Sequence, residues 1–372
     1  MGHKAMKRGL AATASLSLAV LALAGCGGSG GGVSAPSTPS SQTVQQTNLV
    51  QDTSGAAFTD AKLINAWGLG LSASGNLWVA DNGTGDSTAY GVDGHPQATV
   101  VAVAPSGAGG GSKPSGLVIN STSDFLGDTV IFATESGTIS GWQSGGASTL
   151  RADNSATGAV YKGAAIAVDG TDNLLYATNF HAGTIDVFNK AYQPVAYGSL
   201  SKTGAHAAAS PFTDPNLPAG FAPFGIRNIN GNLYVTYAKQ NAQKTADVAG
   251  AGNGAIDVYS PAGTLLMHLV SGGALNSPWG LALAPAGFGN SGASLLVGNF
   301  GDGHINAYDP TSGSSLGALA TSGGTLAIDG LWGLTFGTGA TANTLFFTSG
   351  PSHETHGLLG SLTVVGAASK KS

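Results

Sequence analysis

The segment Trp67-Gly68-Leu69-Gly70-Leu71 is the first of six short, apolar segments that recur along the chain, each containing a glycine. A turn follows it, and then a second apolar segment, Leu77-Trp78-Val79-Ala80-Asp81, which ends at a carboxylate. Some units have a third segment that ends in an aromatic residue, as in Thr184-Ile185-Asp186-Val187-Phe188. The corresponding glycines of the six units are Gly68, Gly116, Gly163, Gly225, Gly280 and Gly333.

These segments are predicted to be strands of one repeating sheet. They are rich in Val, Ile, Leu, Tyr and Phe, and clusters of Gly, Asn, Asp and Ser separate them, which is typical of antiparallel strands joined by tight turns. The corresponding glycines lie about 50 to 60 residues apart, which fits one four-stranded blade with its loops. The sequence therefore predicts an all-β protein, a six-bladed β-propeller of four-stranded antiparallel blades spanning residues 47–366.

A ring of blades needs a strand that joins its two ends. The last unit ends at Ser361-Leu362-Thr363-Val364-Val365, and no fourth strand follows it. A short strand, Thr47-Asn48-Leu49-Val50-Gln51, precedes the first full unit. We therefore expect this N-terminal strand near Leu49 to complete the sixth blade and close the ring.

The N-terminus has the charge pattern of a secretory signal. Basic residues lie between Lys4 and Arg8, an apolar stretch covers residues 10–24, and Leu23-Ala24-Gly25-Cys26 resembles a bacterial lipobox. Cys26 is the only cysteine, so no intramolecular disulfide can form. We expect a lipoprotein signal peptide over 1–25, lipidation at Cys26, a flexible Gly/Ser/Pro linker over 26–46 and a short polar tail over 367–372. The alternative is an ordinary cleaved signal followed by a free thiol.

Lipidation would place the protein in the cell envelope, anchored and facing the periplasm or the exterior. Charged residues make up 9% of the chain and the formal net charge is −5. No Lys/Arg cluster lies outside the signal, which argues against nucleic acid as a partner. There is no second long apolar run either, so the lipid anchor is the only expected contact with the membrane.

Up-and-down strand order predicts where the polar residues gather. The loop between the second and third strands of each blade lies at the same end as the start of the first strand, so six such loops surround one end of the channel, here called the mouth. Propellers commonly bind ligands there. The candidate ligand-binding residues on these loops are Asp81, Asn82, Glu135, Asn179, His181, Lys239, Asn299, Asp302, His353, Glu354 and His356.

Some of these residues could hold a metal ion. Calcium takes six to eight oxygen ligands, and Glu135, Asn179 and Asn299 are the candidates for that role. Histidines from different blades, His181, His304, His353 and His356, could instead bind zinc. The alternatives are that Asp and Asn cap their own turns and that the histidines are solvated or hydrogen-bonded in loops. The recurring aromatic residues Trp67, Phe224, Trp279 and Trp332 are interpreted as packing between inner strands rather than as a sugar-stacking surface.

Several long strings carry a family resemblance. They include residues 178–188, 277–289 and 297–303 and the tail motif His353-Glu354-Thr355-His356-Gly357-Leu358. Over nearly all of residues 47–366, the chain resembles an uncharacterised family of exported bacterial proteins. The resemblance implies a six-bladed propeller and supplies no activity.

A more distant resemblance lies in Gly75-Asn76-Leu77-Trp78-Val79 and Gly231-Asn232-Leu233-Tyr234-Val235, which are similar to NHL repeats and to gluconolactonase-like propellers. Those propellers include calcium-dependent lactone hydrolases, a zinc-dependent amidating lyase and binding scaffolds. The glutamate that lactonases carry early in the first blade is not evident, because this strand has Asn65-Ala66-Trp67-Gly68. Fold analogy does not select the chemistry.

Two functions follow from these observations. The first is a binding or scaffold propeller whose mouth engages a polysaccharide, a peptide or a partner protein. The second is a hydrolase or lyase that uses a calcium or zinc ion at the mouth, as the lactonase-like propellers do.

Overall fold

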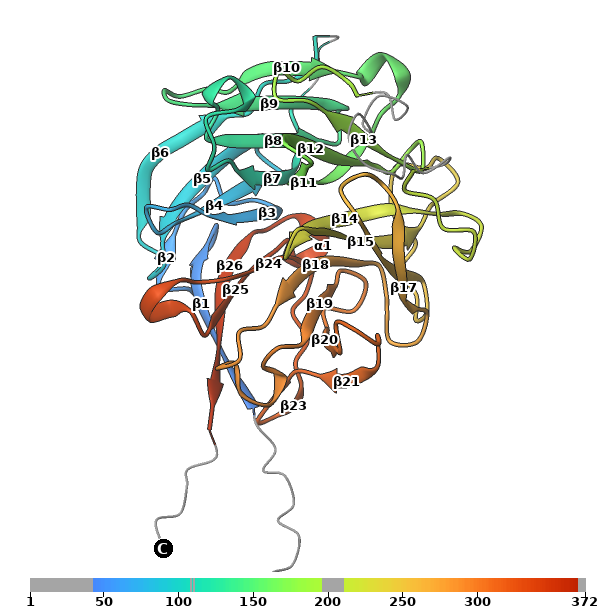
Figure 1. Ribbon diagram of the computed structural model, residues 1–372. Helices are drawn as coiled ribbons and strands as arrows, with labels where there is room; N and C mark the ends of the chain where they lie inside the picture. Colours follow the sequence, from blue (N-terminus) through green and yellow to red (C-terminus); the bar gives the residue numbers. More distant parts are fainter. Residues whose placement is uncertain (1–42, 108, 110, 196–210, 367–372) are drawn as a thin grey trace, which may run out of the picture. The chain divides into compact units, whose positions relative to one another are not determined.

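Six sheets follow one another around a central axis in the computed structural model, which describes residues 43–107, 109, 111–195 and 211–366 (Figure 1). The expectations for the signal peptide over 1–25, for Cys26 and for the tail over 367–372 concern residues outside these ranges. The neighbouring strands of the blades are antiparallel, apart from the two-residue strand β2 (Phe58–Thr59), which lies parallel to β1 (Thr43–Gln51) at an edge, and this confirms the predicted all-β, six-bladed β-propeller.

The first three blades follow in chain order. Blade 1 consists of β3 (Ala66–Leu71), β4 (Asn76–Asp81), β5 (Asp86–Gly91) and β6 (Pro96–Ala102). Blade 2 consists of β7 (Pro114–Ile119), β8 (Val130–Thr134), β9 (Thr138–Trp142) and β10 (Thr149–Asp153). Blade 3 consists, in the described residues, of β11 (Tyr161–Asp169), β12 (Asp172–Asn179) and β13 (Thr184–Phe188).

The other three blades complete the ring. Blade 4 consists of β14 (Phe221–Ile229), β15 (Asn232–Lys239), β16 (Gly254–Tyr259) and β17 (Leu265–Ser271). Blade 5 consists of β18 (Pro278–Leu283), β19 (Leu295–Asn299), β20 (Ile305–Tyr308) and β21 (Ser315–Ala318). Blade 6 consists of β24 (Leu331–Phe336), β25 (Thr344–Ser349), β26 (Leu358–Val365) and β1 (Thr43–Gln51), with β2 (Phe58–Thr59) beside β1.

A few short elements lie outside the blades. They are the hairpin of β22 (Ala320–Thr321) and β23 (Gly324–Thr325), the one-turn helix α1 (Pro351–Glu354), and the 3-10 turns Phe125–Gly127, Ser155–Thr157, Gly289–Ser291 and Gly339–Thr341. No helix in the described part of the chain is both long enough and apolar enough to span a membrane.

The N-terminal strand shares a sheet with the C-terminal strand. β1 pairs antiparallel with β26 from Thr43↔Val365 to Gln51↔Leu358, with a bulge between Asn48 and Val50. It begins at Thr43, inside the stretch 26–46 that the sequence suggested was a linker. Two ends of the described chain therefore meet in blade 6, as Figure 1 also shows.

The innermost strands surround the channel. β3, β7, β11, β14, β18 and β24 contact one another in that order, and β24 contacts β3. The repeating glycines allow this approach: a Cβ at Gly225 would lie 2.1 Å from the carbonyl oxygen of Trp279 in the next blade, and one at Gly280 would lie 2.4 Å from that of Trp332. The repeat that identified the fold is thus a packing requirement of the ring.

Aromatic side chains fill the channel between the inner strands. Trp67 stacks on Trp332 with ring centroids 3.6 Å apart, Phe300 stacks on the same Trp332 at 4.1 Å, and Phe224 packs beside it. We call this cluster the aromatic plug; its members are Trp67, Phe180, Phe224, Trp279, Phe300 and Trp332. The interpretation of Trp67, Phe224, Trp279 and Trp332 as packing residues is confirmed.

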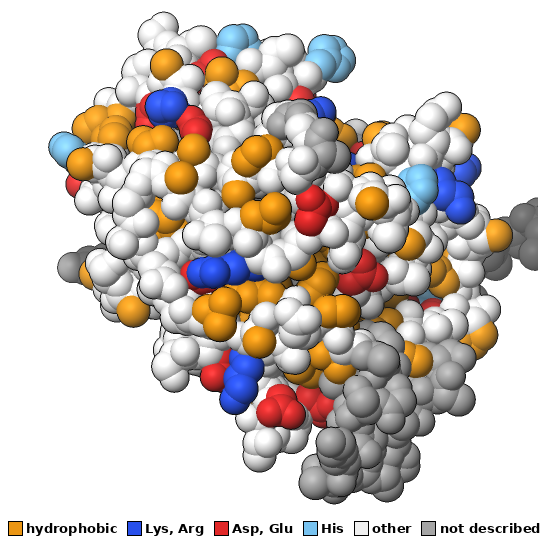
Figure 2. Space-filling view, turned by 90° about the horizontal axis from the view of Figure 1, so that it is seen from above, with side chains coloured by type: hydrophobic (Ala, Val, Ile, Leu, Met, Phe, Trp, Pro, Cys, Tyr) orange, Lys and Arg blue, Asp and Glu red, His pale blue; other side chains and the backbone are white. Residues whose placement is uncertain are grey.

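The surface carries few charges. On the face seen in Figure 2, Lys and Arg side chains are scattered rather than gathered into a basic patch, which agrees with a charged fraction of 9%.

Candidate functional site

The mouth brings together polar groups from several blades above the aromatic plug. The amide nitrogen Nδ2 of Asn82, after blade 1's second strand, donates to Oε2 of Glu135, in the corresponding loop of blade 2, at 2.9 Å. The other carboxylate oxygen of Glu135 pairs with the ammonium of Lys162 on β11 in blade 3. Two candidates predicted from the sequence, Asn82 and Glu135, therefore meet at one place.

Lys162 is the centre of this arrangement, and its side chain is only 3% exposed. Its Nζ lies 5.1 Å from the ring centroid of Trp67 and 5.7 Å from that of Phe180, within the range of a cation–π contact. The ion pair with Glu135 and the two rings stabilise a charge that burial alone would disfavour.

The charge of Lys162 also acts on two more carboxyl groups. Burial raises the pKa of Glu354, which belongs to α1; the charges of Glu135 and Asp247 raise it further, whereas Asn65 and Lys162 oppose the rise. Burial also raises the pKa of Asp247, and Ser277 and Lys162 act in the opposite direction. Oε1 of Glu354 is buried without a hydrogen-bond partner. One ammonium thus pairs with Glu135 and acts electrostatically on two further carboxyl groups in different environments.

The sequence reasoning missed Lys162, although the repeat contains a signal for it. In four units the residue before the repeating glycine is aromatic, namely Trp67, Phe224, Trp279 and Trp332, and in the third unit it is Lys162. A lysine where other units have an aromatic residue departs from the repeat, and this departure could have identified Lys162 as a candidate.

Asp81 lies inside blade 1 and not in the mouth. Its side chain is fully buried, and Oδ2 accepts a hydrogen bond from Thr88 Oγ1 at 2.8 Å. Burial raises the pKa of this carboxyl well above its usual range. Its position links β4 to β5 within the blade.

Asn179 and Asn299 are held in their own surroundings. Nδ2 of Asn179 donates to Asp186 at 3.0 Å, and its Oδ1 accepts from the backbone N–H of Ala182 at 3.2 Å. Nδ2 of Asn299 donates to Asp302 at 3.1 Å and to the carbonyl oxygen of Ala274 at 2.8 Å. Asn179 thus makes the turn contact that the sequence left open as the alternative to ligand binding, whereas Oδ1 of Asn299 is buried without a hydrogen-bond partner.

The remaining candidates are spread around the rim. Nδ1 of His356 lies 2.7 Å from Oδ2 of Asp52, which follows β1. His353 is exposed on α1, Lys239 is exposed at the end of β15, and His181 is half-buried beside Gly158. Asp302 also accepts a hydrogen bond from Asn276, at 3.2 Å.

The mouth does not fit the proposed metal ligands Glu135, Asn179 and Asn299. The carboxylate of Glu135 already pairs with Lys162, whose fixed positive charge repels a second cation. Oδ1 of Asn179 already accepts a hydrogen bond from the backbone N–H of Ala182 at 3.2 Å. Oδ1 of Asn299 is buried without a hydrogen-bond partner, but one amide oxygen falls far short of the six to eight oxygen ligands that calcium takes. These three residues therefore do not form a calcium or zinc site at the mouth.

A separate cluster with metal-ligand chemistry lies on blade 4. Nδ1 of His268 is 2.6 Å from Oδ2 of Asp214 and 2.8 Å from Oδ1 of Asp257, and the three ligand atoms lie within 4.8 Å of one another. Burial, with the charge of Asp214, raises the pKa of Asp257 to about 6. Tyr259 donates to the other oxygen of Asp257 at 3.0 Å. The sequence analysis selected none of these residues.

Comparison with known proteins gives a family and a fold. No family model matches the chain. An uncharacterised protein of Acanthamoeba polyphaga mimivirus is 32% identical over 323 residues, which are 83% of this chain and 77% of that protein.

Solved structures that share the fold include two enzymes. A glucose dehydrogenase has a TM-score of 0.55 and 13% identity, over 87% of this chain and 100% of that one. A catalytically inactive virginiamycin B lyase from Staphylococcus aureus with quinupristin has a TM-score of 0.51 and 14% identity, over 87% of this chain and 100% of that one. At such identities the likeness concerns the fold alone.

Proposed function

The chain belongs to the same family as the uncharacterised mimivirus protein, and from that premise we propose that it binds a neutral polar ligand at the mouth. The observation that carries the proposal is the ammonium of Lys162, which is almost fully buried and surrounded by groups from neighbouring blades. Structural ion pairs in a propeller do not require a convergence of side chains from several blades. A ligand site requires such a convergence, because it must present several groups to one molecule.

The chemistry of these groups favours a ligand with hydroxyl or amide groups. Asn82 and Lys162 supply hydrogen-bond donors, and the carboxyl oxygens of Glu135 and Glu354 supply acceptors. A polysaccharide or a peptide carries both donors and acceptors and needs no strong charge. The low charge of the surface agrees with a ligand that is not steered electrostatically.

The proposal includes export and anchoring. The basic and apolar N-terminal segment and the lone Cys26 support a lipoprotein of the cell envelope. A binding propeller held at the membrane would capture a polysaccharide, a peptide or a partner protein outside the cytoplasm.

A second candidate function is a lyase or hydrolase at the same mouth. It is favoured by the contrast between Glu135, which pairs with Lys162, and Glu354, whose pKa burial raises. Two carboxyl groups held in such different environments can divide the roles of base and acid. In this version Lys162 would stabilise negative charge on the substrate.

Binding arrays test the two functions. The purified, exported chain is applied to glycan and peptide arrays, together with Lys162→Met and with Lys244→Met, a control that removes an exposed charge. Binding that Lys162→Met abolishes and Lys244→Met preserves would support the mouth site. Turnover of a bound glycan or lactone that Glu354→Gln abolishes without loss of binding would select the enzyme, and equal binding by all three chains would overturn the proposed mouth site.

A further inference from the structure

The channel has a cavity at its other end. It has a volume of about 620 Å³ and lies where the inner strands finish, on the side of the aromatic plug away from Lys162, and Trp279 of the plug forms part of its wall. Exposed residues such as Ser121 and Thr338 line its rim, so the cavity reaches the surface. Its volume lies in the range of small-molecule sites.

The wall of the cavity is aliphatic. Each blade contributes at least one large apolar side chain: Leu69, Leu117, Ile166, Ile226, Leu281 and Leu334. Further apolar side chains, among them Leu71 and Ile119, extend this wall, and neutral polar groups such as Asn228, which donates to the carbonyl oxygen of Ile166 at 2.8 Å, lie beside them. Such a wall would bury the apolar body of a ligand.

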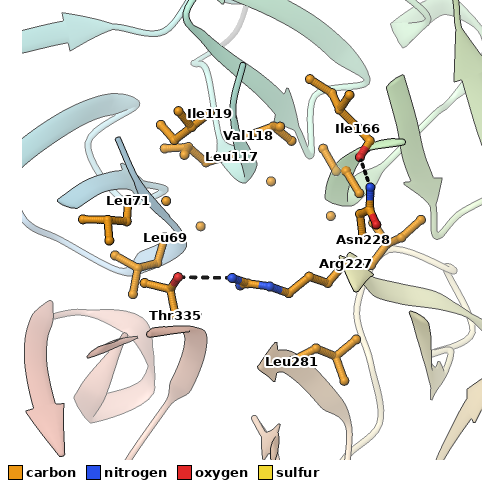
Figure 3. Close-up of a pocket in the computed structure, with 18 of the residues that line it drawn as sticks. Leu69, Leu71, Leu117, Val118, Ile119, Ile166, Arg227, Asn228, Leu281 and Thr335 are labelled. Atoms are coloured by element: carbon orange, nitrogen blue, oxygen red, sulfur yellow. Dashed lines mark hydrogen bonds between the residues drawn. The ribbon is translucent and has the colours of Figure 1, made fainter. Parts of the chain in front are cut away.

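Arg227 is the one ionisable residue among the described residues that line this cavity. Figure 3 shows its side chain crossing the pocket from β14 toward Thr335 on β24, past Leu281. Nη1 donates to the carbonyl oxygen of Leu334 at 2.7 Å, and Nη2 donates to Oγ1 of Thr335 at 3.1 Å. These two acceptors are neutral, and they use two of the five donors of a guanidinium.

No carboxylate of the described residues pairs with Arg227, unlike Arg151, which is bound to Asp128 through two hydrogen bonds. Burial accordingly lowers the pKa of Arg227, and no charged group opposes that effect. The equivalent positions of the other repeats hold small or neutral residues, among them Gly70, Val118 and Thr335. The cation is thus particular to blade 4, and the fold does not require it in every unit.

We propose that this cavity binds an organic carboxylate with an apolar body. The carboxylate would accept paired hydrogen bonds from the guanidinium of Arg227, and the body would fill the space between the aliphatic side chains of the six inner strands. The site is distinct from the mouth and does not depend on the function proposed there.

Calorimetric titration of the full chain tests this site. The probes are benzoate, 2-naphthoate and dodecanoate, each compared with the alcohol of the same skeleton. We expect at least one acid to bind at one site per chain, about 10- to 100-fold more tightly than its alcohol, since a hydrogen bond to a charged group has that effect. Failure of all three acids to bind, or equal affinity for acid and alcohol, overturns the proposal.

Variants locate the site. Arg227→Met should remove the preference for the acid and leave binding of the alcohol unchanged, whereas the exposed control Lys244→Met should bind like the wild type. Ile119→Trp, which fills part of the cavity, should weaken acid and alcohol alike. If Arg227→Met does not fold, Arg227→Lys keeps the charge but loses the planar fork and should lower acid affinity. Unchanged acid binding in both Ile119→Trp and the folded Arg227 variant contradicts the assignment.

Discussion

Trp67 in blade 1 stacks on Trp332 in blade 6, with ring centroids 3.6 Å apart and planes inclined by 20°. The first complete repeat and the last one therefore meet through their aromatic rings, in addition to the pairing of β1 with β26. Both contacts join residues that are far apart in the chain, so the ring forms only when the whole repeat array is in place.

Removing Trp332 should destabilise the ring strongly. Its ring is 1% exposed and contacts Trp67, Trp279 and Phe300, so we expect Trp332→Ala to lower the free energy of unfolding by about 3–5 kcal/mol. Urea unfolding measures this. Trp142→Ala, at a half-buried position in blade 2, is the control and should cost less; an equal loss would contradict a special role of the plug.

Gly225→Ala should destabilise the protein because its new methyl group would lie 2.1 Å from the carbonyl oxygen of Trp279. Overpacking of this kind costs about 1–3 kcal/mol. Gly146→Ala is the matched control, since no atom lies within 4 Å of its Cβ position and its φ is not positive. Thermal unfolding of both variants checks the explanation of the repeat; a neutral Gly225→Ala would refute it.

Lys162→Met should leave the carboxylate of Glu135 without its ammonium. Breaking a fully buried ion pair lowers the free energy of unfolding by about 3–5 kcal/mol. Because the side chain of Glu135 is 19% exposed, we expect a loss at or below the lower end of this range. The double variant Lys162→Met/Glu135→Gln should recover part of it, because no unpaired charge then remains. A double-mutant cycle in urea measures the coupling, and a coupling near zero would show that the pair is not energetically linked.

The cluster on blade 4 should make stability depend on pH. The pKa of Asp257 rises from 3.8 to about 6 in the folded protein, so this group favours folding when protonated, and that contribution is lost as the pH rises from about 4 to about 6. Asp257 is fully buried beside Asp214, His268 and Tyr259, and a rise of about two pKa units corresponds to about 3 kcal/mol.

Unfolding curves of the wild type and Asp257→Asn at pH 4 and pH 6.5 test that dependence. The wild type should lose more stability over this interval than the variant, since the amide cannot ionise. Asp309→Asn is the control with the opposite sign, because backbone hydrogen bonds lower the pKa of Asp309. Identical pH profiles for the wild type and Asp257→Asn would contradict the raised pKa.

Cys26→Ser should abolish lipid attachment if the N-terminal segment is a lipoprotein signal. Labelling with radioactive palmitate in an exporting bacterial host, followed by detergent phase partitioning, measures this. The wild type should carry the label and enter the detergent phase, and the variant should do neither. A wild-type chain without label would leave the ordinary cleaved signal as the explanation.

The fold was readable from the sequence because one physical requirement recurs. Inner strands approach the next blade so closely that a glycine is needed at positions such as Gly225 and Gly280, and the corresponding glycines repeat at blade spacing. The strand that pairs with β26 was also visible, though it starts at Thr43, where the Gly/Ser/Pro-rich composition had suggested a linker. The average composition of residues 26–46 is that of a linker, and such an average does not reveal that the last few residues of the stretch belong to a strand.

The site was only partly readable. Asn82 and Glu135 were expected at one mouth and do meet there, because strand order fixes which loops share an end. Sequence position alone did not separate Asp81, which faces the interior of blade 1, from its neighbour Asn82. Lys162 and Arg227 lie on inner strands, where a charge is exceptional, and only a comparison of equivalent positions among the repeats distinguishes them.

The pairing of β1 with β26 has a mechanical consequence. Tension applied to the chain ahead of Thr43 would pull β1 along its own axis, so the hydrogen bonds to β26 would bear the load together in shear rather than open one after another. The pairing of β1 with β26 would then set the mechanical resistance of the molecule, and the other five blades would stay folded until these two strands separate.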